Sequence, residues 1–346
     1  MTIKKSLFIF LILFVSIGAQ AQWDEGALYI TKSLSKESIK SVYARTSGGE
    51  IAVTGGQESE ARIEVYVRPN NNRESLTKAE MKTRIEDVYD LEVTASGGKI
   101  TAIAKPKTFN LSSRKTLNIA FKIYVPKNTS TDLSTSGGSI HLTGLSGQQN
   151  FSTSGGGLDL DQLSGKINGK TSGGGISISN CNDDINVSTS GGSIDAENCS
   201  GMIRLSTSGG TINLTKLKGT IDAATSGGTV RASEISGEIK AHTSGGSIKL
   251  REMAGNVDVS TSGGNIDMEI DELGKYITAS NSGGNIELKL PKNKGADLRL
   301  RADNIRLENI ENFSGDKEEH KVNGKINGGG AMVDVSTSGT ITLGVH

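Results

Sequence analysis

The sequence predicts an all-β protein whose central part is a single-stranded β-solenoid, or β-helix, with coils of eighteen residues. The first observation is a tripeptide, Ser-Gly-Gly, that recurs in strict register. The second is an alternation of apolar and polar residues inside each repeat. The third is the composition: 45 glycines, four prolines and only 4% aromatic residues indicate many tight corners rather than a core of large side chains.

The repeat is read directly from the spacing of Ser-Gly-Gly. Eight copies follow one another at steps of eighteen residues, and a ninth follows after twenty. Two earlier copies, at Ser47 and Ser96, are irregularly spaced. Repeats at a fixed period are typical of solenoids, in which each repeat is one structural unit. The copies in register begin at Ser136, Ser154, Ser172, Ser190, Ser208, Ser226, Ser244 and Ser262, and the ninth begins at Ser282.

Each repeat contains the pattern of two short strands. After Gly-Gly and one variable residue comes an apolar residue, as at Ile176, and a second one follows two residues later, as at Ile178. A glycine, as at Gly165, marks a second turn, and another alternating segment follows it, as at Ile203 and Leu205. A period of two is that of a β-strand with one buried face. One repeat buries too little apolar surface to fold alone, so we expect repeats to stack at the strand spacing of about 4.8 Å.

The Thr-Ser-Gly-Gly segment is expected to form the corner of each coil. Glycine accepts positive φ and has no Cβ that could clash with the neighbouring coil. The preceding threonine, as at Thr189, falls on the inward side by alternation, which predicts a ladder of hydrogen-bonded hydroxyls, with Asn281 replacing threonine in the ninth copy. The apolar steps do not recur every six residues, as a left-handed hexapeptide helix requires, and this favours a right-handed or flattened solenoid.

The N-terminus has the pattern of an export signal. Lys4 and Lys5 precede an apolar run from Leu7 to Ile17, and Ala19-Gln20-Ala21 gives a small-residue cleavage pattern. Residues 1–21 are therefore predicted to be a signal peptide, with an exported mature chain that is periplasmic, on the cell surface or secreted. No later segment is apolar enough to predict a membrane span.

The remaining chain divides into three predicted regions. Residues 22–134 are expected to be an N-terminal β capping region, with strands near 61–67 and 117–125 and one short helix from about Lys78 to Tyr89. Thr77 and Glu80 form a capping-box pattern at the start of that helix. Residues 135–290 are the predicted solenoid, and residues 291–346 are the predicted C-terminal coils and cap, because Val333 to Ile341 returns to the repeat pattern.

These motifs carry a resemblance to a known family. The Ser-Thr-Ser-Gly-Gly-x-Ile pattern and the Gly-Lys-Ile-Asn-Gly-Gly-Gly stretch at Gly324 to Gly330 resemble the bacterial putative-adhesin family of β-strand-repeat proteins, whose function is undefined. The resemblance covers residues 41–343. It implies the repeat fold and brings no functional residues with it.

The residues with reactive side chains predict no catalytic, cofactor or metal site. Cys181 and Cys199 are one repeat apart in an apolar column, which favours two stacked core thiols and leaves a disulfide between adjacent coils as the alternative. The four histidines share no column with the cysteines or with one another, so no metal site and no cofactor are expected. These histidines are His141, His242, His320 and His346.

Charge and column composition point away from most other functions. Lys+Arg and Asp+Glu both number 38, so no excess charge suggests nucleic acid as a partner. A β-helix carbohydrate-active enzyme is the main alternative, but it needs paired carboxylates on one face, and the outward column from Asp159 through Lys249 to Asp267 alternates in residue type. We therefore expect a non-enzymatic structural or adhesion-type protein that contacts a surface polysaccharide or a protein. A periplasmic scaffold or sensor remains a second alternative.

Overall fold

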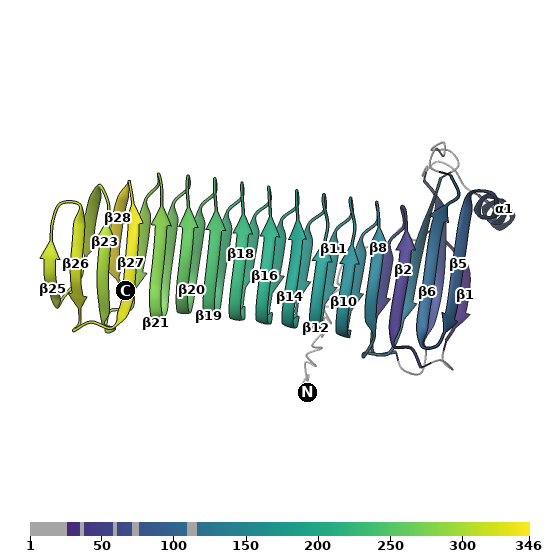
Figure 1. Cartoon of the computed structure of the whole chain (residues 1–346), viewed down its shortest axis with the longest axis horizontal. Helices are drawn as coiled ribbons and strands as arrows, with labels where there is room; N and C mark the ends of the chain where they lie inside the picture. Colours follow the sequence, from purple (N-terminus) through teal and green to yellow (C-terminus); the bar gives the residue numbers. More distant parts are fainter. Residues whose placement is uncertain (1–25, 35–37, 58–60, 71–75, 109–115) are drawn as a thin grey trace, which may run out of the picture.

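The chain winds into a long rod that is closed by a broader cap at one end (Figure 1). The structure is a computed structural model that describes residues 26–34, 38–57, 61–70, 76–108 and 116–346; the predicted signal peptide lies outside them. The described residues form 28 strands and one helix. None of the helical residues among them belongs to a segment long and apolar enough to cross a membrane.

Each coil of the rod contributes a long strand to one parallel ladder and a short strand to another. The long-strand ladder contains β8 (Ser130–Thr135), β10 (Ser146–Ser152), β12 (Ser164–Lys170), β14 (Asn182–Thr189), β16 (Ser200–Thr207) and β18 (Lys218–Thr225). The short-strand ladder contains β9 (Ile140–Thr143), β11 (Leu158–Asp161), β13 (Ile176–Ser179), β15 (Ile194–Glu197), β17 (Ile212–Thr215) and β22 (Ile286–Leu290). Three strands run through both ladders, namely β19 (Val230–Thr243), β20 (Ile248–Thr261) and β21 (Ile266–Asn281).

The eighteen-residue register predicted from the sequence is confirmed. Ile167, Ile185, Ile203 and Ile221 lie opposite one another in successive parallel strands, and all four are fully buried. Buried and outward residues alternate along the strands, so the core is one continuous stack of Ile, Leu, Val and Ala columns between the two ladders. This arrangement is a flattened β-solenoid, and the predicted fold class is confirmed.

The threonine of each corner forms the predicted ladder, with backbone groups as its partners. The Thr153 hydroxyl donates to the carbonyl of Gly138 in the preceding coil at 2.8 Å and accepts from its own coil's Gly156 N–H at 3.3 Å. The same pair of bonds recurs coil after coil, as at Thr189. Asn281 replaces the hydroxyl with its amide, which donates to Gly264 and accepts from Gly284. A buried side chain thus satisfies two partly buried backbone groups at each of these corners.

The two glycines of each corner differ in their role, and the expectation of positive φ there was wrong. Neither of them lies in the left-handed region in the rod. A Cβ on the second glycine, Gly192, would lie 2.1 Å from the carbonyl oxygen of Gly174, so this glycine is required by the close approach of adjacent coils. A Cβ on the first glycine, Gly191, would lie 3.5 Å from its nearest neighbour, which is ordinary contact.

Positive φ occurs instead at the opposite turn of the coil. The glycines there have φ between 96° at Gly165 and 137° at Gly255, and Asp183 takes the same place with φ 83°. The residue three positions earlier is also left-handed, with φ near 55° at Asn180 and Lys216. The second turn predicted from the glycine spacing is confirmed, and it is where the backbone conformation is demanding.

The N-terminal cap continues both ladders with strands that are distant in sequence. Its elements are β1 (Ala27–Ser33), β2 (Ser41–Thr46), β3 (Ile51–Thr54), β4 (Arg62–Pro69), α1 (Lys78–Val88), β5 (Tyr89–Ser96), β6 (Lys99–Pro106) and β7 (Leu117–Tyr124). Strands β2 and β3 form a first coil, since they pair in parallel with β8 and β9. On the other side β2 pairs with β6 and β3 with β7, and the antiparallel strands β5, β4 and β1 complete the cap.

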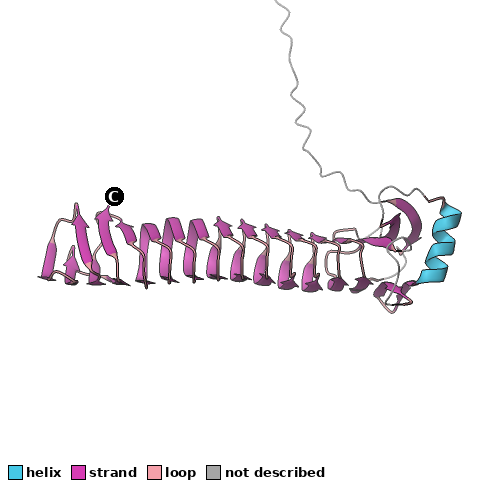
Figure 2. Ribbon diagram, turned by 90° about the horizontal axis from the view of Figure 1, so that it is seen from above, coloured by secondary structure: helices cyan, strands magenta, loops and turns pink. Residues whose placement is uncertain are grey.

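Helix α1 forms where the capping box predicted it. Thr77 accepts from the Glu80 N–H, and the Glu80 carboxylate accepts from the Thr77 N–H at 2.8 Å. Its buried face consists of Met81, Ile85 and Val88. Figure 2 shows the helix at the end of the rod that is opposite to the C-terminus, where it covers apolar side chains that no further coil would bury.

At the other end, the last coil in the sequence is not the last coil in space. The strands are β23 (Ala296–Arg301), β24 (Asn304–Glu308), β25 (Phe313–Lys317), β26 (Lys321–Ile326), β27 (Ala331–Thr337) and β28 (Thr340–Val345). Strands β27 and β28 pair with β21 and β22 on one side and with β23 and β24 on the other. The antiparallel strands β26 and β25 then extend the long-strand ladder beyond β23.

Candidate functional site

The outward faces of the rod are covered by side chains that bond to the same column in the next coil. Asn213 donates to Asp195 at 2.7 Å, and Asn198 donates to Asn180 at 2.6 Å. Ion pairs also join neighbouring coils, as between Lys216 and Glu234 at 3.7 Å. These polar side chains follow the surface, and their contacts are those of solvated sheet faces rather than of a site where groups converge on a ligand.

The carboxylates that the enzyme alternative would need are kept apart by the register. Asp159 and Asp195 lie in one column with Ser177 between them. Two strand spacings of about 4.8 Å separate the backbones of such residues. Asp267, in the same column, receives a hydrogen bond from Arg251 at 2.9 Å. The column predicted from the sequence therefore exists, and its acidic members have separate polar partners.

A hollow lies where the rod meets the N-terminal cap. Two cavities, of about 270 and 770 Å³, meet there and share four lining residues. We call the combined feature the corner groove. The shared residues are Gly48, Arg68, Asn118 and Gly137.

The strand register explains why the groove is hollow. Outward positions of β3 and β7 are occupied by Ala52 and Ala120, which leave space above the sheet. In the neighbouring strand β4, Tyr66 lies opposite Ala120, and Arg68 lies opposite Asn118. Large side chains on one strand thus border a floor of small ones.

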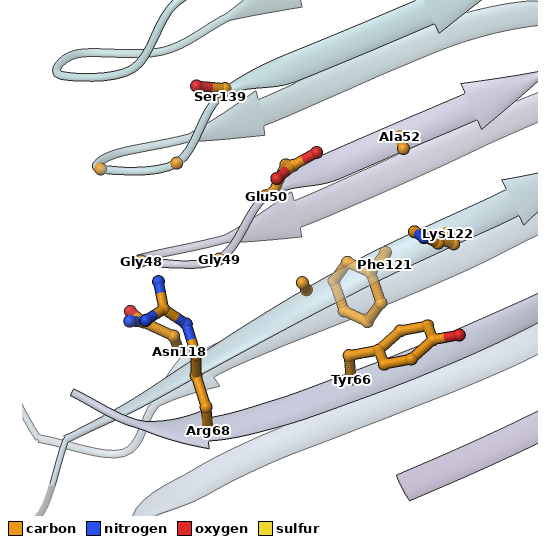
Figure 3. Close-up of a pocket in the computed structure, with 13 residues that line it drawn as sticks. Gly48, Gly49, Glu50, Ala52, Tyr66, Arg68, Asn118, Phe121, Lys122 and Ser139 are labelled. Atoms are coloured by element: carbon orange, nitrogen blue, oxygen red, sulfur yellow. The ribbon is translucent and has the colours of Figure 1, made fainter. Parts of the chain in front are cut away.

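Figure 3 shows the side chains around the first cavity. The Arg68 guanidinium extends toward Asn118 and the Gly48 corner, and the Tyr66 ring lies farther along β4. The Tyr66 hydroxyl donates to Glu64 at 3.0 Å, which fixes the ring, and the Lys122 ammonium lies 5.4 Å from the ring centre. Glu50 and Ser139 border the opposite side. The first cavity therefore combines the Tyr66 ring, two cationic side chains and hydrogen-bonding groups.

A histidine lies between two carboxylates beside this groove. His141 Nε2 is 3.2 Å from Glu50 Oε1, and His141 Nδ1 is 3.4 Å from Asp159 Oδ2. The hydrogen bond with His141 lowers the pKa of the Asp159 carboxyl. The row of Glu50, His141 and Asp159 connects the groove to the outward face of the rod, and it positions Glu50 at the groove's edge.

The two cysteines are free and buried in the core, as their apolar column favoured. The Cys181 N–H donates to Cys199 Sγ at 3.4 Å, and the side chains stack in adjacent coils. The hydrogen bond with Cys199, together with burial, raises the pKa of the Cys181 thiol. A buried thiol with a raised pKa is a poor nucleophile, so Cys181 has the character of a core side chain.

Sequence reasoning did not find a group of ligand-type side chains near the C-terminal end. Ligand atoms of Glu269, Asp271 and His346 lie within 4.8 Å of one another. In the sequence His346 follows Asp271 by 75 positions. No local sequence pattern could therefore have grouped the three residues. Glu269 also lies 3.9 Å from Arg251 and His346 hydrogen-bonds to the Ile270 carbonyl, contacts that already stabilise the side chains as they stand.

The repeat architecture agrees with a family match over nearly the whole sequence. The model of the Toastrack DUF4097 family matches residues 15–344. The chain belongs to this family. No curated protein matches the chain.

Several solved structures resemble this member of the Toastrack family at low identity. A putative adhesin from Bacteroides fragilis NCTC 9343 is 13% identical, with 92% of this chain and 96% of that chain covered and a TM-score of 0.24. A putative lipid binding protein from Parabacteroides distasonis ATCC 8503 is 15% identical, with coverage of 91% and 96% and a TM-score of 0.30. A putative cell adhesion protein from Clostridium sporogenes ATCC 15579 is 11% identical, with coverage of 92% and 98% and a TM-score of 0.19.

Proposed function

We propose that this chain is an exported, non-catalytic protein of the structural or adhesion type, whose rigid rod holds binding surfaces away from their point of attachment. The observation that carries the proposal is the continuous parallel pairing of both ladders from β8 to β22, which stays in register as far as β20 and shifts register between β20 and β21. A stack in which every coil bonds to both neighbours resists bending, and it presents long faces of fixed geometry.

The charge arrangement supports binding over catalysis. General acid–base cleavage of a polysaccharide needs two carboxylates facing one bond. Among the described residues that line the corner groove, Glu50 is the one carboxylate. The partner that we propose is a surface polysaccharide or a protein, and the predicted localisation is outside the cytoplasm.

Protease accessibility on intact cells of the native host tests this function. We expect external protease to digest the rod on intact cells and to release soluble coils. Protection of the chain until the outer envelope is opened would contradict the adhesion function and favour a periplasmic scaffold or sensor. Release of new reducing ends from polysaccharides by the purified chain would contradict its non-catalytic character.

A further inference from the structure

We propose that the corner groove is a binding site for an acidic polysaccharide segment, one that carries carboxylate groups on its sugar rings. This inference deepens the function proposed above and rests on it for the exposure of the groove outside the cell. It depends on three features of the groove: its shape, its charge and the corner glycines that form part of its lining.

The shape fits a segment of polymer. The first cavity, about 270 Å³, borders Tyr66, and the second, about 770 Å³, extends over the corner toward Lys105 and Thr116. Arg68 and Gly137 line both cavities. Ligand cavities have volumes of about 300 to 1,000 Å³, so the two together offer room for successive rings of one chain that crosses the Arg68 position.

The charge and the ring select the chemistry of the occupant. Arg68, Lys105 and Lys122 line the groove against a single carboxylate, Glu50. A guanidinium presents paired N–H donors that match the geometry of a carboxylate. The Tyr66 ring, held by its hydroxyl on Glu64, offers a flat apolar face, and such amphipathic rings suit ligands that are apolar on one side and polar at the rim. A hexuronate ring has this combination of a C–H face, hydroxyl groups and a carboxylate.

The corner glycines in the lining, Gly137 and Gly138, allow a sugar ring to approach the backbone. Gly138 is required by the fold, because a Cβ there would lie 2.0 Å from the Gly49 carbonyl oxygen. Gly137, which lines both cavities, is not: a Cβ there would meet nothing closer than 3.8 Å. A side chain at position 137 would therefore occupy the groove without disturbing the stack, which makes this position a direct probe of binding.

Titration of the purified mature chain with oligogalacturonate of defined length, followed by calorimetry, tests the proposal. Maltooligosaccharide of equal length and poly-glutamate serve as comparison ligands. We expect binding of oligogalacturonate that weakens with salt, since the contacts are ionic, and much weaker binding of the other two. Arg68→Gln should weaken binding about tenfold or more, because hydrogen bonds to charged groups are strong. Arg231→Gln, on the rod's outward face, is the matched control and should leave affinity unchanged.

Position 137 supplies a second, independent pair of variants. Gly137→Asp places a carboxylate in the groove and should abolish binding, whereas Gly209→Asp makes the same change at a corner far along the rod, where a Cβ would lie 3.7 Å from its neighbours. Both variants should unfold at the wild-type temperature. Equal binding of poly-glutamate, or full affinity in Gly137→Asp, would overturn the assignment.

The outcome is separable from that of the proposed function. If external protease digests the rod on intact cells but oligogalacturonate does not bind, the groove assignment fails and the adhesion function stands. If the chain is sealed inside the envelope and still binds oligogalacturonate through Arg68, the adhesion function fails and the groove assignment stands.

Discussion

Each coil of the rod turns twice, and the two turns differ in how they respond to a side chain. At the Ser-Gly-Gly corner the second glycine touches the backbone of the preceding coil, as Gly192 touches Gly174. At the opposite turn the demand is a left-handed conformation, and one coil meets it with Asp183 instead of glycine. The glycines of the opposite turn approach the preceding coil just as closely, since a Cβ on Gly201 would lie 2.2 Å from the Asp183 carbonyl oxygen. The corner glycine therefore answers one demand, close backbone contact, whereas the opposite turn combines such contact with a left-handed conformation. Asp183 shows that a single coil can still accommodate a side chain at the opposite turn.

The largest effect is expected from Gly192→Ala at the corner. The new Cβ would lie 2.1 Å from the Gly174 carbonyl oxygen, inside a stack that is bonded on both sides, so the coils must separate. We expect a loss of about 3 kcal/mol in the free energy of unfolding. Urea denaturation followed by circular dichroism measures it.

Its matched control changes the neighbouring residue. Gly191→Ala adds the same methyl group where a Cβ lies 3.5 Å from its nearest neighbour, and its effect should stay within about 0.5 kcal/mol. Equal losses in the two variants would show that the clash at the second glycine does not set the coil spacing.

A smaller loss is expected when the threonine that supports the corner loses its hydroxyl. Thr189→Val keeps the shape but removes the donor to the Gly174 carbonyl and the acceptor for the Gly192 N–H, and both backbone groups stay partly buried. We expect a loss of about 2 kcal/mol in unfolding free energy. Thr189→Ser retains the hydroxyl and should lose clearly less in the same urea experiment. A greater loss in the serine variant would mean that the methyl group, rather than the two hydrogen bonds, stabilises the corner.

A substitution at the opposite turn should raise the free energy of unfolding. Asp183 has φ 83°, whereas the residues that pair with it in the adjacent coils are both glycines, Gly165 and Gly201. Asp183→Gly removes the conformational cost of a non-glycine residue in this region, but it also removes the hydrogen bond from the Gly165 N–H to the Asp183 carboxylate. We expect a net rise of about 1 kcal/mol in unfolding free energy, measured by thermal unfolding. A fall would indicate that the hydrogen bond outweighs the strain.

The repeat made the rod predictable, because every coil has the same neighbours at the same sequence distance. The columns of Ile167 and Ile185 and the inward threonines follow from the spacing of eighteen, and Asn281 follows from aligning the ninth copy, which comes after a step of twenty. The sequence also shows why two irregular copies behave differently. Ser47 follows Thr46, whose hydroxyl bonds the Ile119 carbonyl, and its corner joins the stack. Ser96 follows Ala95, has no such hydroxyl, and turns a hairpin between β5 and β6 with positive φ at Gly97 and Gly98.

The corner groove could not be predicted in the same way. Both β4 and β7 were expected as strands, and their alternation places Tyr66 and Lys122 outward. The groove, however, depends on β7 pairing with β3 and with β4, at sequence separations that no period specifies. Arg68 and Gly137 meet because the first coil lies between two distant segments. Periodicity specifies contacts between repeats, and contacts between a repeat and a cap need the structure.

The smallest effect is expected at the other left-handed position of the opposite turn. Lys216 has φ 57° and continues a column with Asn180 and Asn198, whose side chains are hydrogen-bonded to each other. Asparagine tolerates this conformation better than lysine does. Lys216→Asn should therefore raise the unfolding free energy by about 0.5 kcal/mol, since the exposed ion pair with Glu234 that it removes contributes little. Thermal unfolding of Lys216→Asn is to be compared with that of Lys216→Ala. If the alanine variant gains as much unfolding free energy, the column of asparagines has no part in forming the turn. Relief of side-chain crowding would then explain the gain.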